Sequence, residues 1–179
     1  MNEQSFCLQP FPSASSLPHL RITGSIARRS NRLAIRYAIR GHLAGVAIPA
    51  FADIPARREK LWKETCFEFF LAVKNSPRYW EFNLSPAGDW NVYRFAGYRQ
   101  GMQEEPAFAS LPFSFETRPE FLVLVLELDL DRIVQAGQPL EVAISAVIKP
   151  GKGEATYWAL THGAQQADFH RRDSFVIQL

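Results

Sequence analysis

The stretch YWEFNLSPAGDWNVYRF, residues 79–95, decides the fold of this chain. Its centre, SPAGD, has the chemistry of a tight turn, because proline fixes φ and glycine can take a positive φ. We therefore expect 79–84 and 90–95 to pair as a β-hairpin. The run holds two Trp, two Tyr and two Phe, and its polar members include Glu81, Asn83, Asn91 and Arg94. A plain core strand would not carry so many polar groups, nor a plain surface strand so many aromatic rings.

Alternation divides this hairpin into two faces. The first strand has a wholly apolar face, which we expect to be the core face, made of Trp80, Phe82 and Leu84. Its other face carries Tyr79, Glu81 and Asn83. On the return strand, Asn91, Tyr93 and Phe95 alternate with Trp90, Val92 and Arg94.

The dominant hydrophobic period along the rest of the chain is also two. LAIRYAIR (33–40) and FEFFLAV (67–73) alternate, and FLVLVLELDL (121–130) begins apolar on both faces, as is typical of an interior strand. Further candidate strands are LRITGSIAR (20–28), HLAGVAI (42–48), PFSFET (112–117), EVAISAVIK (141–149), ATYWAL (155–160) and SFVIQL (174–179). Helical signal is limited to short turns within 104–111 and 129–137.

Many short strands separated by turn signals predict an all-β fold, either an antiparallel β-sandwich or a barrel. The sandwich is favoured because strands that are apolar on both sides need cover on both faces. The chain has 179 residues, which fits a single domain spanning 1–179. Its 47% hydrophobic and 21% charged content is ordinary for a globular protein.

Charge and hydropathy limit the classes of partner. The formal net charge is +2, with 20 basic and 18 acidic residues, so we expect no nucleic-acid partner. The most apolar run, 121–128, is too short to cross a bilayer, so we expect no membrane partner. The start, MNEQSFCLQPFPSASS, does not read as a secretory signal, and we expect a cytoplasmic location.

Polar groups converge if the strand 67–73 pairs beside the hairpin. Glu68 then joins the face that carries Glu81 and Asn83. A surface that combines carboxylates, amides and aromatic rings suits a polar ligand with some apolar area, such as a sugar. The alternative interpretation is a solvated sheet face with scattered aromatic residues.

Two segments, LWKETCFEFFLAV (61–73) and YWEFNLSPAGDWNVYRFAGYRQGM (79–102), resemble the DOMON-like domain family, which is related to family 9 carbohydrate-binding modules. The closing DFHRRDSFVIQL (168–179) is similar to the end of such domains. The resemblance implies a bacterial single-domain protein with a β-sandwich of jelly-roll type. Relatives bind sugars or haem, so it implies a fold and a ligand class but no reaction.

Our first hypothesis is a non-catalytic carbohydrate-binding domain. Trp90 and Tyr93 would be its stacking platforms. Its hydrogen-bonding set would be Glu68, Glu81, Asn83, Asn91 and Arg94 or Arg99. Each has a structural alternative: Trp90 could belong to the core, and Glu68 could pair with Arg94 or Arg99 to offset its burial.

A second hypothesis is haem binding, as in haem-carrying DOMON relatives, which the resemblance implies would use a Met and a His as axial ligands. Met102 and His170 are the candidates. Met102 lies in the polar segment RQGMQEE, which offers little apolar cover for a porphyrin. We predict no cofactor for the first hypothesis.

Two further functions stay open. Glu68 and Glu81 could form an acid/base pair of a sugar-active enzyme, although no known catalytic motif is present. The protein could instead be an interaction domain that forms a homodimer through a sheet edge or an aromatic patch.

Metal ligation is not predicted. His162, Asp168 and His170 match no metal motif, and the loop acids Asp53, Asp89 and Asp173, which could serve the structural calcium known in related modules, form no cluster in sequence.

Overall fold

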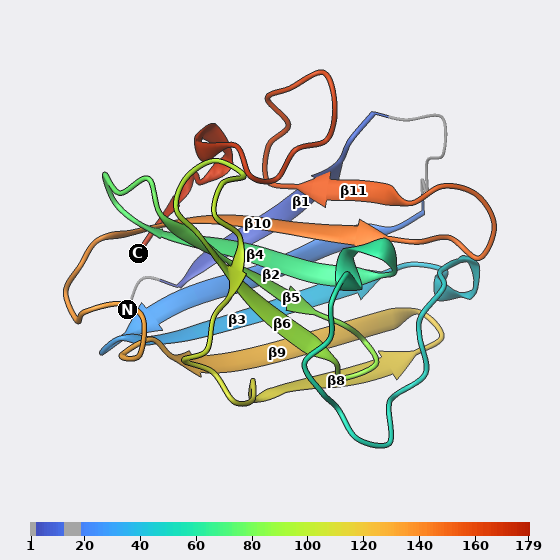
Figure 1. The fold of residues 1–179 in the computed structure, drawn as a ribbon. Helices are drawn as coiled ribbons and strands as arrows, with labels where there is room; N and C mark the ends of the chain where they lie inside the picture. The colour runs from blue at the N-terminus through green and yellow to red at the C-terminus, as the bar shows by residue number, and fades with distance from the viewer. Residues whose placement is uncertain (1–2, 13–18) are drawn as a thin grey trace.

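The computed structural model describes residues 3–12 and 19–179 and is all-β (Figure 1). Residues 1–2 and 13–16 of the N-terminal segment interpreted above lie outside the described part. Within it, the strands are β1 (Gln4–Pro10), β2 (Arg21–Arg29), β3 (Arg32–Arg40), β4 (Cys66–Val73), β5 (Tyr79–Leu84), β6 (Trp90–Phe95), β7 (Gln103–Glu104), β8 (Phe113–Arg118), β9 (Phe121–Asp129), β10 (Leu140–Ile148), β11 (Thr156–Ala159) and β12 (Ile177–Gln178).

These strands form one antiparallel sheet that curls on itself, in the order β7-β6-β5-β4-β10-β11-β1-β2-β3-β9-β8, with β12 paired to β10. Strand β1 joins the two halves, because Gln4–Leu8 pairs with β2 whereas Gln9 and Pro10 pair with β11. The half that contains β4, β5, β6 and β10 is called the front layer below. The arrangement confirms the predicted antiparallel β-sandwich of jelly-roll type.

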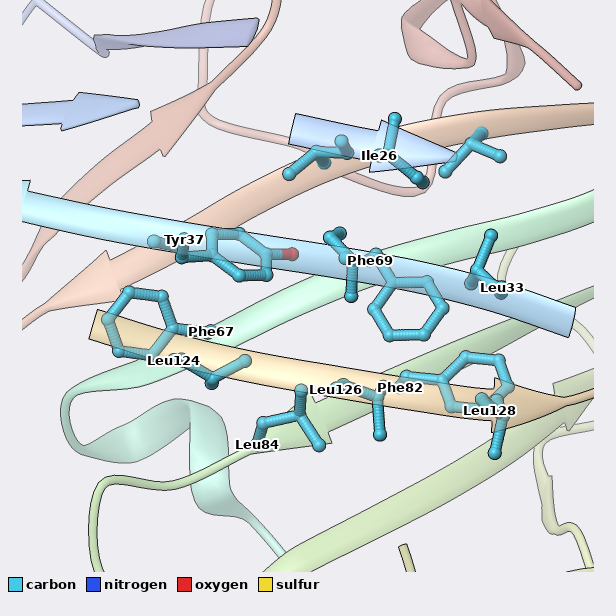
Figure 2. Packing of buried hydrophobic residues seen from close by; sticks show 14 of the residues in the cluster. Ile26, Leu33, Tyr37, Phe67, Phe69, Phe82, Leu84, Leu124, Leu126 and Leu128 are labelled. Atoms are coloured by element: carbon cyan, nitrogen blue, oxygen red, sulfur yellow. The ribbon is translucent and has the colours of Figure 1, made fainter. Parts of the chain in front are cut away.

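The main core lies between the two layers, as Figure 2 shows. Phe69 of β4 and Phe82 of β5 stack with ring centroids 4.3 Å apart and meet leucines of β9. Tyr37 of β3 crosses the core, and its hydroxyl donates a hydrogen bond of 2.7 Å to the backbone oxygen of Glu68. The layers are therefore joined by apolar contact and by a buried hydrogen bond.

The predicted hairpin is confirmed at both of its strands. Leu84 pairs with Trp90, and the Ser85 amide donates to the Asp89 carbonyl at 2.9 Å. Gly88 adopts a φ of +89°, which is the conformation that the turn requires of a glycine. Phe82 and Leu84 enter the core as expected.

Three local predictions were wrong. Segment 42–48 is not a strand: its buried residues, Leu43 and Val46, are three apart, and Leu43–Gly45 forms a 3-10 turn, η1. Only Ile177–Gln178 of 174–179 is extended. Strand β9 is buried on one face only. Val125, on its other face, is 38% exposed to solvent.

Burial on both faces belongs instead to the front layer. Seven of the eight residues of β4 are buried, and β10 is buried along nearly its whole length. The remaining helical pieces are the 3-10 turns η2 (Leu61–Lys63) and η3 (Arg172–Ser174), which agrees with the expectation of short helical turns only. Their positions were predicted wrongly, because none of the 3-10 turns lies within 104–111 or 129–137. No helix in residues 3–12 and 19–179 is long and apolar enough to cross a membrane.

Gly24 of β2 tests the packing in the layer that contains β1, β2, β3 and β9. It pairs with Phe6 on one side and with Tyr37 on the other. A Cβ at this position would lie 2.0 Å from the backbone oxygen of Arg36 and 2.3 Å from Cζ of Phe6. We expect Gly24→Ala to lower the free energy of unfolding by at least about 1–3 kcal/mol, measured by urea denaturation.

The matched control is Gly45→Ala, since a Cβ there meets no atom within 4 Å. We expect it to change the stability by no more than about 0.5 kcal/mol. Equal unfolding midpoints for the two variants would contradict the described packing of β1, β2 and β3.

Candidate functional site

A second apolar cluster covers the outer face of the front layer. Its buried members are Phe70, Ala72, Tyr79, Tyr93, Phe95, Ala143 and Phe175, and Trp62 and Phe169 pack against it. The cover comes from the chain itself: Trp62 of η2 packs against Tyr93, with ring centroids 5.8 Å apart, and Phe175 packs against Tyr79 at 5.8 Å. Thus the face that carries Glu81 and Asn83 is largely roofed, and the expectation of an open surface was wrong.

The roof leaves one substantial cavity, of about 330 Å³, which we call the front cavity. Glu68 and Glu81 line it from neighbouring strands, where Glu68 is opposite Asn83 and Glu81 is opposite Phe70. The other lining residues are Trp62, Phe95, Arg99, Met102, Val147, Tyr157, Ala167, Phe169 and His170. The cavity therefore combines carboxyl groups with aromatic walls.

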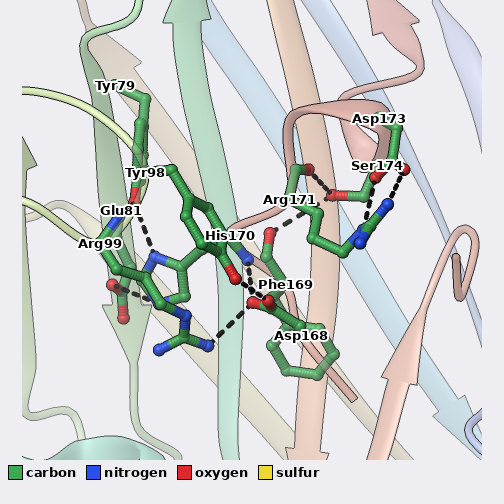
Figure 3. Close-up of polar contacts among 10 residues, drawn as sticks. All are labelled: Tyr79, Glu81, Tyr98, Arg99, Asp168, Phe169, His170, Arg171, Asp173 and Ser174. Carbon is green, nitrogen blue, oxygen red and sulfur yellow. Dashed lines mark hydrogen bonds and ion pairs between the residues drawn. The ribbon is translucent and has the colours of Figure 1, made fainter. Parts of the chain in front are cut away.

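His170 connects the C-terminal segment to the wall of the front cavity (Figure 3). The Tyr79 hydroxyl accepts a hydrogen bond from the Arg99 amide at 3.2 Å, so its own proton is available to His170 Nδ1 at 2.8 Å. We assign the remaining imidazole hydrogen to Nε2, which lies 3.7 Å from Glu81 Oε2. The other Glu81 oxygen accepts a hydrogen bond from Asn83 Nδ2 at 2.8 Å.

Asp168 fastens the loop after β6 to the same C-terminal segment. It accepts 2.8 Å and 3.1 Å hydrogen bonds from the Arg99 guanidinium and the His170 amide, and it also contacts the Tyr98 hydroxyl (Figure 3). Partial burial disfavours the Asp168 carboxylate, but these donors lower its pKa overall. Arg99 therefore brings its charge to the cavity already paired.

Glu68 is the least satisfied polar group of the site. Glu68 is 2% exposed. Its burial is the largest cause that raises its pKa well above the usual value, and the nearby Glu81 carboxyl is the second. Among the described residues, the buried side-chain polar atoms without a hydrogen-bond partner are Glu68 Oε1 and Ser145 Oγ, which belong to paired positions on β4 and β10. Ser145 does not line the front cavity, and its hydroxyl acts on the Glu68 carboxyl, whose pKa it lowers against the effect of burial.

Burial also dominates the titration of the two groups that face each other across the cavity wall. It raises the pKa of Glu81 to about 7, against the Asn83 hydrogen bond and Arg99, which lower it. It lowers the pKa of His170 to about 4, and Arg99 acts in the same direction. Near neutral pH, His170 is consequently neutral and does not compensate the charge of an ionised Glu81.

Three predicted ligand-binding residues lie on the expected face but outside the front cavity. Asn91 Nδ2 donates to the Tyr93 hydroxyl at 2.9 Å and to the Arg58 carbonyl at 3.0 Å, and its Oδ1 accepts from Arg57 at 2.7 Å. Asn83 is fully buried against Glu81. Asn83, Asn91 and Tyr93 are thus engaged with the protein and support the wall of the site.

Two other predicted residues point to the opposite face. Trp90 is part of the main core, and the Arg57 guanidinium lies 4.4 Å from its ring centroid. Arg94 is exposed and bonds Gln103 at 2.9 Å. Neither lines the front cavity, because strand alternation places both on the far side of β6 from Tyr93.

The haem candidates, Met102 and His170, do line the same cavity. However, both ring nitrogens of His170 already face protein groups, Nδ1 at Tyr79 and Nε2 at Glu81. An axial bond to iron would require one of these contacts to break. The residues present therefore do not fit a haem ligand pair.

Metal-ligating groups do not gather elsewhere in residues 3–12 and 19–179, where no group of three or more His, Cys, Asp or Glu side chains could hold an ion. The loop acids Asp89 and Asp173 are instead paired with Arg58 and Arg171. His162 bonds the Gln9 carbonyl at 2.8 Å.

Sequence reasoning missed four aromatic residues of the cavity, Trp62, Phe95, Tyr157 and Phe169. Trp62 and Phe169 lie within segments that carry the family resemblance, which is the one signal that could have indicated them. Tyr157 lies on β11. It comes near Glu68 because β10 pairs with both β4 and β11, and these pairings join segments far apart in the sequence.

Comparison with known proteins reveals likeness in structure. A scan against models of protein families finds no match, and a search of the curated proteins finds none. A candidate carbohydrate-binding protein from Bacteroides uniformis superposes with a TM-score of 0.68 at 14% identity, over 96% of this chain and 83% of that chain.

A family 9 carbohydrate-binding module from Caldicellulosiruptor kristjanssonii also matches. Its glucose complex gives a TM-score of 0.47 at 12% identity, over 80% of this chain and 69% of that chain. Its cellotriose complex gives 0.46 at 11% identity, over 84% and 71%. At these identities the comparisons establish a shared fold, on the strength of the first structure.

The raised pKa of Glu81 predicts a pH-dependent stability. Between about pH 4.5 and 7 the folded protein keeps a proton that the unfolded chain has lost, so the contribution of Glu81 to stability falls as the pH rises. Glu81→Gln cannot ionise. We expect its free energy of unfolding, relative to the wild type, to rise by on the order of 2 kcal/mol between about pH 5 and 8 in urea denaturation.

The lowered pKa of His170 has the opposite sign, since stability rises with pH from about 4 to its unfolded value, but His170 is present in both proteins. Glu127→Gln, which removes an exposed carboxyl of β9, controls for the loss of one charge. A wild-type-to-Glu81→Gln difference that stays constant or falls with pH would contradict the burial of this carboxyl.

Proposed function

We propose that this chain is a non-catalytic ligand-binding domain whose front cavity takes a small saccharide. The observation that carries the proposal is the lining of that cavity, in which two carboxyl groups face aromatic side chains. Aromatic rings cover the C–H faces of a pyranose, and carboxyl oxygens bond its hydroxyls. A volume of about 330 Å³ lies within the range of small-molecule sites.

The polar groups have defined roles in this proposal. The carboxyl groups of Glu68 and Glu81, which both line the cavity, bond ligand hydroxyls, and Glu81 is held in place by Asn83. Arg99, anchored on Asp168, offers its remaining guanidinium hydrogens at the rim. Trp62 and Phe169 are the stacking rings, in place of the Trp90 and Tyr93 expected from sequence.

The comparisons support this ligand class without establishing it. The candidate carbohydrate-binding protein from Bacteroides uniformis shares the fold over nearly the whole chain. We further propose that the resemblance of 61–102 to DOMON-like and family 9 domains reflects a distant relationship. Sugar binding then follows from the cavity of this chain and not from the likeness alone.

A second candidate function, glycoside hydrolysis, is favoured by the presence of two carboxyl groups in one cavity. Hydrolysis needs one carboxyl ionised and the other protonated. Here burial raises the pKa of both Glu68 and Glu81, and within the described residues neither accepts a hydrogen bond from a Lys or Arg side chain. Below about pH 7 both groups therefore keep their protons, which leaves no carboxylate to act as nucleophile or base, so we propose binding without turnover.

The aromatic face of the hairpin is also an unsuitable dimer interface in this proposal. Tyr79, Tyr93 and Phe95 are buried within one copy of the chain, beneath Trp62 and the C-terminal segment. A second chain would have to displace that cover before it reached them. The front cavity is therefore proposed to take a small ligand.

Isothermal titration against a panel of mono- and disaccharides tests the proposal. We expect at least one saccharide to bind, and Trp62→Ala and Arg99→Ala each to weaken it by about 1–3 kcal/mol, because each removes part of the cavity lining. The matched controls are Phe51→Ala, an aromatic residue that is 67% exposed, and Arg94→Ala, on the opposite face of β6.

Both controls should bind the saccharide as the wild type does. Absence of heat with every saccharide at about millimolar concentration, where even a weak site of about −4 kcal/mol is half filled, would contradict the proposal. Loss of binding in Arg94→Ala with retention in Arg99→Ala would move the site to the other face.

The bound saccharide should be recovered unchanged. After prolonged incubation with the protein at about pH 6, mass spectrometry of the ligand and of aryl glycosides of the same sugar should show no cleavage, since burial keeps both carboxyl groups protonated and leaves no carboxylate nucleophile or base. Cleavage that is abolished by Glu81→Gln would contradict the non-catalytic assignment.

A further inference from the structure

The front cavity is lined by two acidic side chains and by one basic side chain that is already engaged. Glu68 and Glu81 both line it, whereas its Arg, Arg99, is paired with Asp168 at 2.8 Å. No lysine is among the lining residues, and His170, whose Nε2 lies 3.7 Å from Glu81 Oε2, is neutral near neutral pH. A cationic ligand would therefore supply the partner that the two carboxyl groups lack when they ionise.

The same cavity has walls that accept cations. Trp62, Phe95, Tyr157 and Phe169 line it, and aromatic faces attract ammonium groups, most strongly when water is excluded. The Glu68 side chain lines the cavity, and among the described residues it accepts no hydrogen bond from a Lys or Arg side chain, so an ammonium would be its first cationic partner. Neutral hydroxyls can occupy the space but leave both carboxyl groups protonated.

We propose, resting on the saccharide-binding function above, that the preferred ligand is an amino sugar whose protonated amine lies between Glu68 and Glu81. The amine replaces the proton that each buried carboxyl otherwise retains, and charge-assisted hydrogen bonds form to the carboxyl groups of Glu68 and Glu81. The sugar ring then packs against the aromatic wall. A neutral sugar gains the packing and the hydrogen bonds but not the ionic contribution.

Binding of the amine is coupled to proton release. Tyr37 and Cys66 are the titratable groups that interact with Glu68 besides Glu81. The groups that interact with Glu81 are Asn83, Arg99, His170, Tyr79 and Tyr93. Of these, Arg99 carries a positive charge, and it is shared with Asp168. An arriving ammonium is thus the strongest available cause for Glu68 and Glu81 to ionise.

The test compares glucosamine, glucose and N-acetylglucosamine by isothermal titration of the whole chain at about pH 6, where an amine of pKa near 8 is charged. We expect glucosamine to bind at least about tenfold more tightly than the two neutral sugars. Repeating the titration in buffers of different ionisation enthalpy should show net proton release with glucosamine and much less with glucose.

Glu68→Gln and Glu81→Gln, which keep the shape but remove the charge, should bring the ratio of glucosamine to glucose affinity towards one. Glu127→Gln, on β9, should leave the ratio unchanged. The wild-type comparison needs no variant to fold, so it decides the inference by itself.

Glucose bound as tightly as glucosamine would overturn the inference and leave the saccharide site standing. A glucosamine preference that persists in both glutamine variants, without proton release, would also overturn it. No heat with any of the three sugars, together with none across the wider panel, would overturn the proposed function and this inference with it.

Discussion

His170 holds the C-terminal segment over the outer face of the front layer, and the candidate site depends on this contact. Its ring packs edge-on against Phe70 and Phe95 at 5.1 and 5.2 Å, and its Nδ1 bonds Tyr79 at 2.8 Å. The front layer is apolar on both faces, so its outer face needs a cover that excludes water. The cover is complete over Tyr79 and Tyr93 but leaves a cavity above Glu68 and Glu81. The fold therefore buries two carboxyl groups beside one cation, Arg99, which is already paired with Asp168.

Much of the fold could be predicted from the sequence, because alternation within β3, β4, β5, β6 and β10 reports directly on strand faces. The SPAGD turn could also be predicted from neighbouring residues alone, and it sets the register in which β5 pairs with β6. The errors arose where burial is decided by distant segments. Strand β9 is as apolar as an interior strand at its start, yet Val125 on its outer side is 38% exposed. Strand β1 was missed because its short, mixed pattern buries only Phe6 and Leu8.

The candidate site was predictable in part. The alternation of side chains along β4 and β5 was enough to predict that Glu68 and Glu81 share one face. Both line the front cavity. Trp90 and Arg94 were included although the same alternation puts them on the opposite face from Glu81. The roof could not be anticipated, because Trp62, Phe169 and His170 reach the hairpin only through tertiary packing. Their packing turned an expected open surface into a partly covered cavity, and Asn91 and Tyr93 are engaged with the protein.

The central claim is that the front cavity, and no other surface, receives a saccharide beside Glu81. A crystal structure of the protein with its tightest-binding sugar measures this most directly. The account predicts the sugar ring against Trp62 or Phe169, with a hydroxyl or amine within about 3 Å of Glu68 or Glu81. A sugar bound on the far face of β6, beside Arg94, would contradict it. So would a front cavity that holds no sugar while sugar binds elsewhere on the protein.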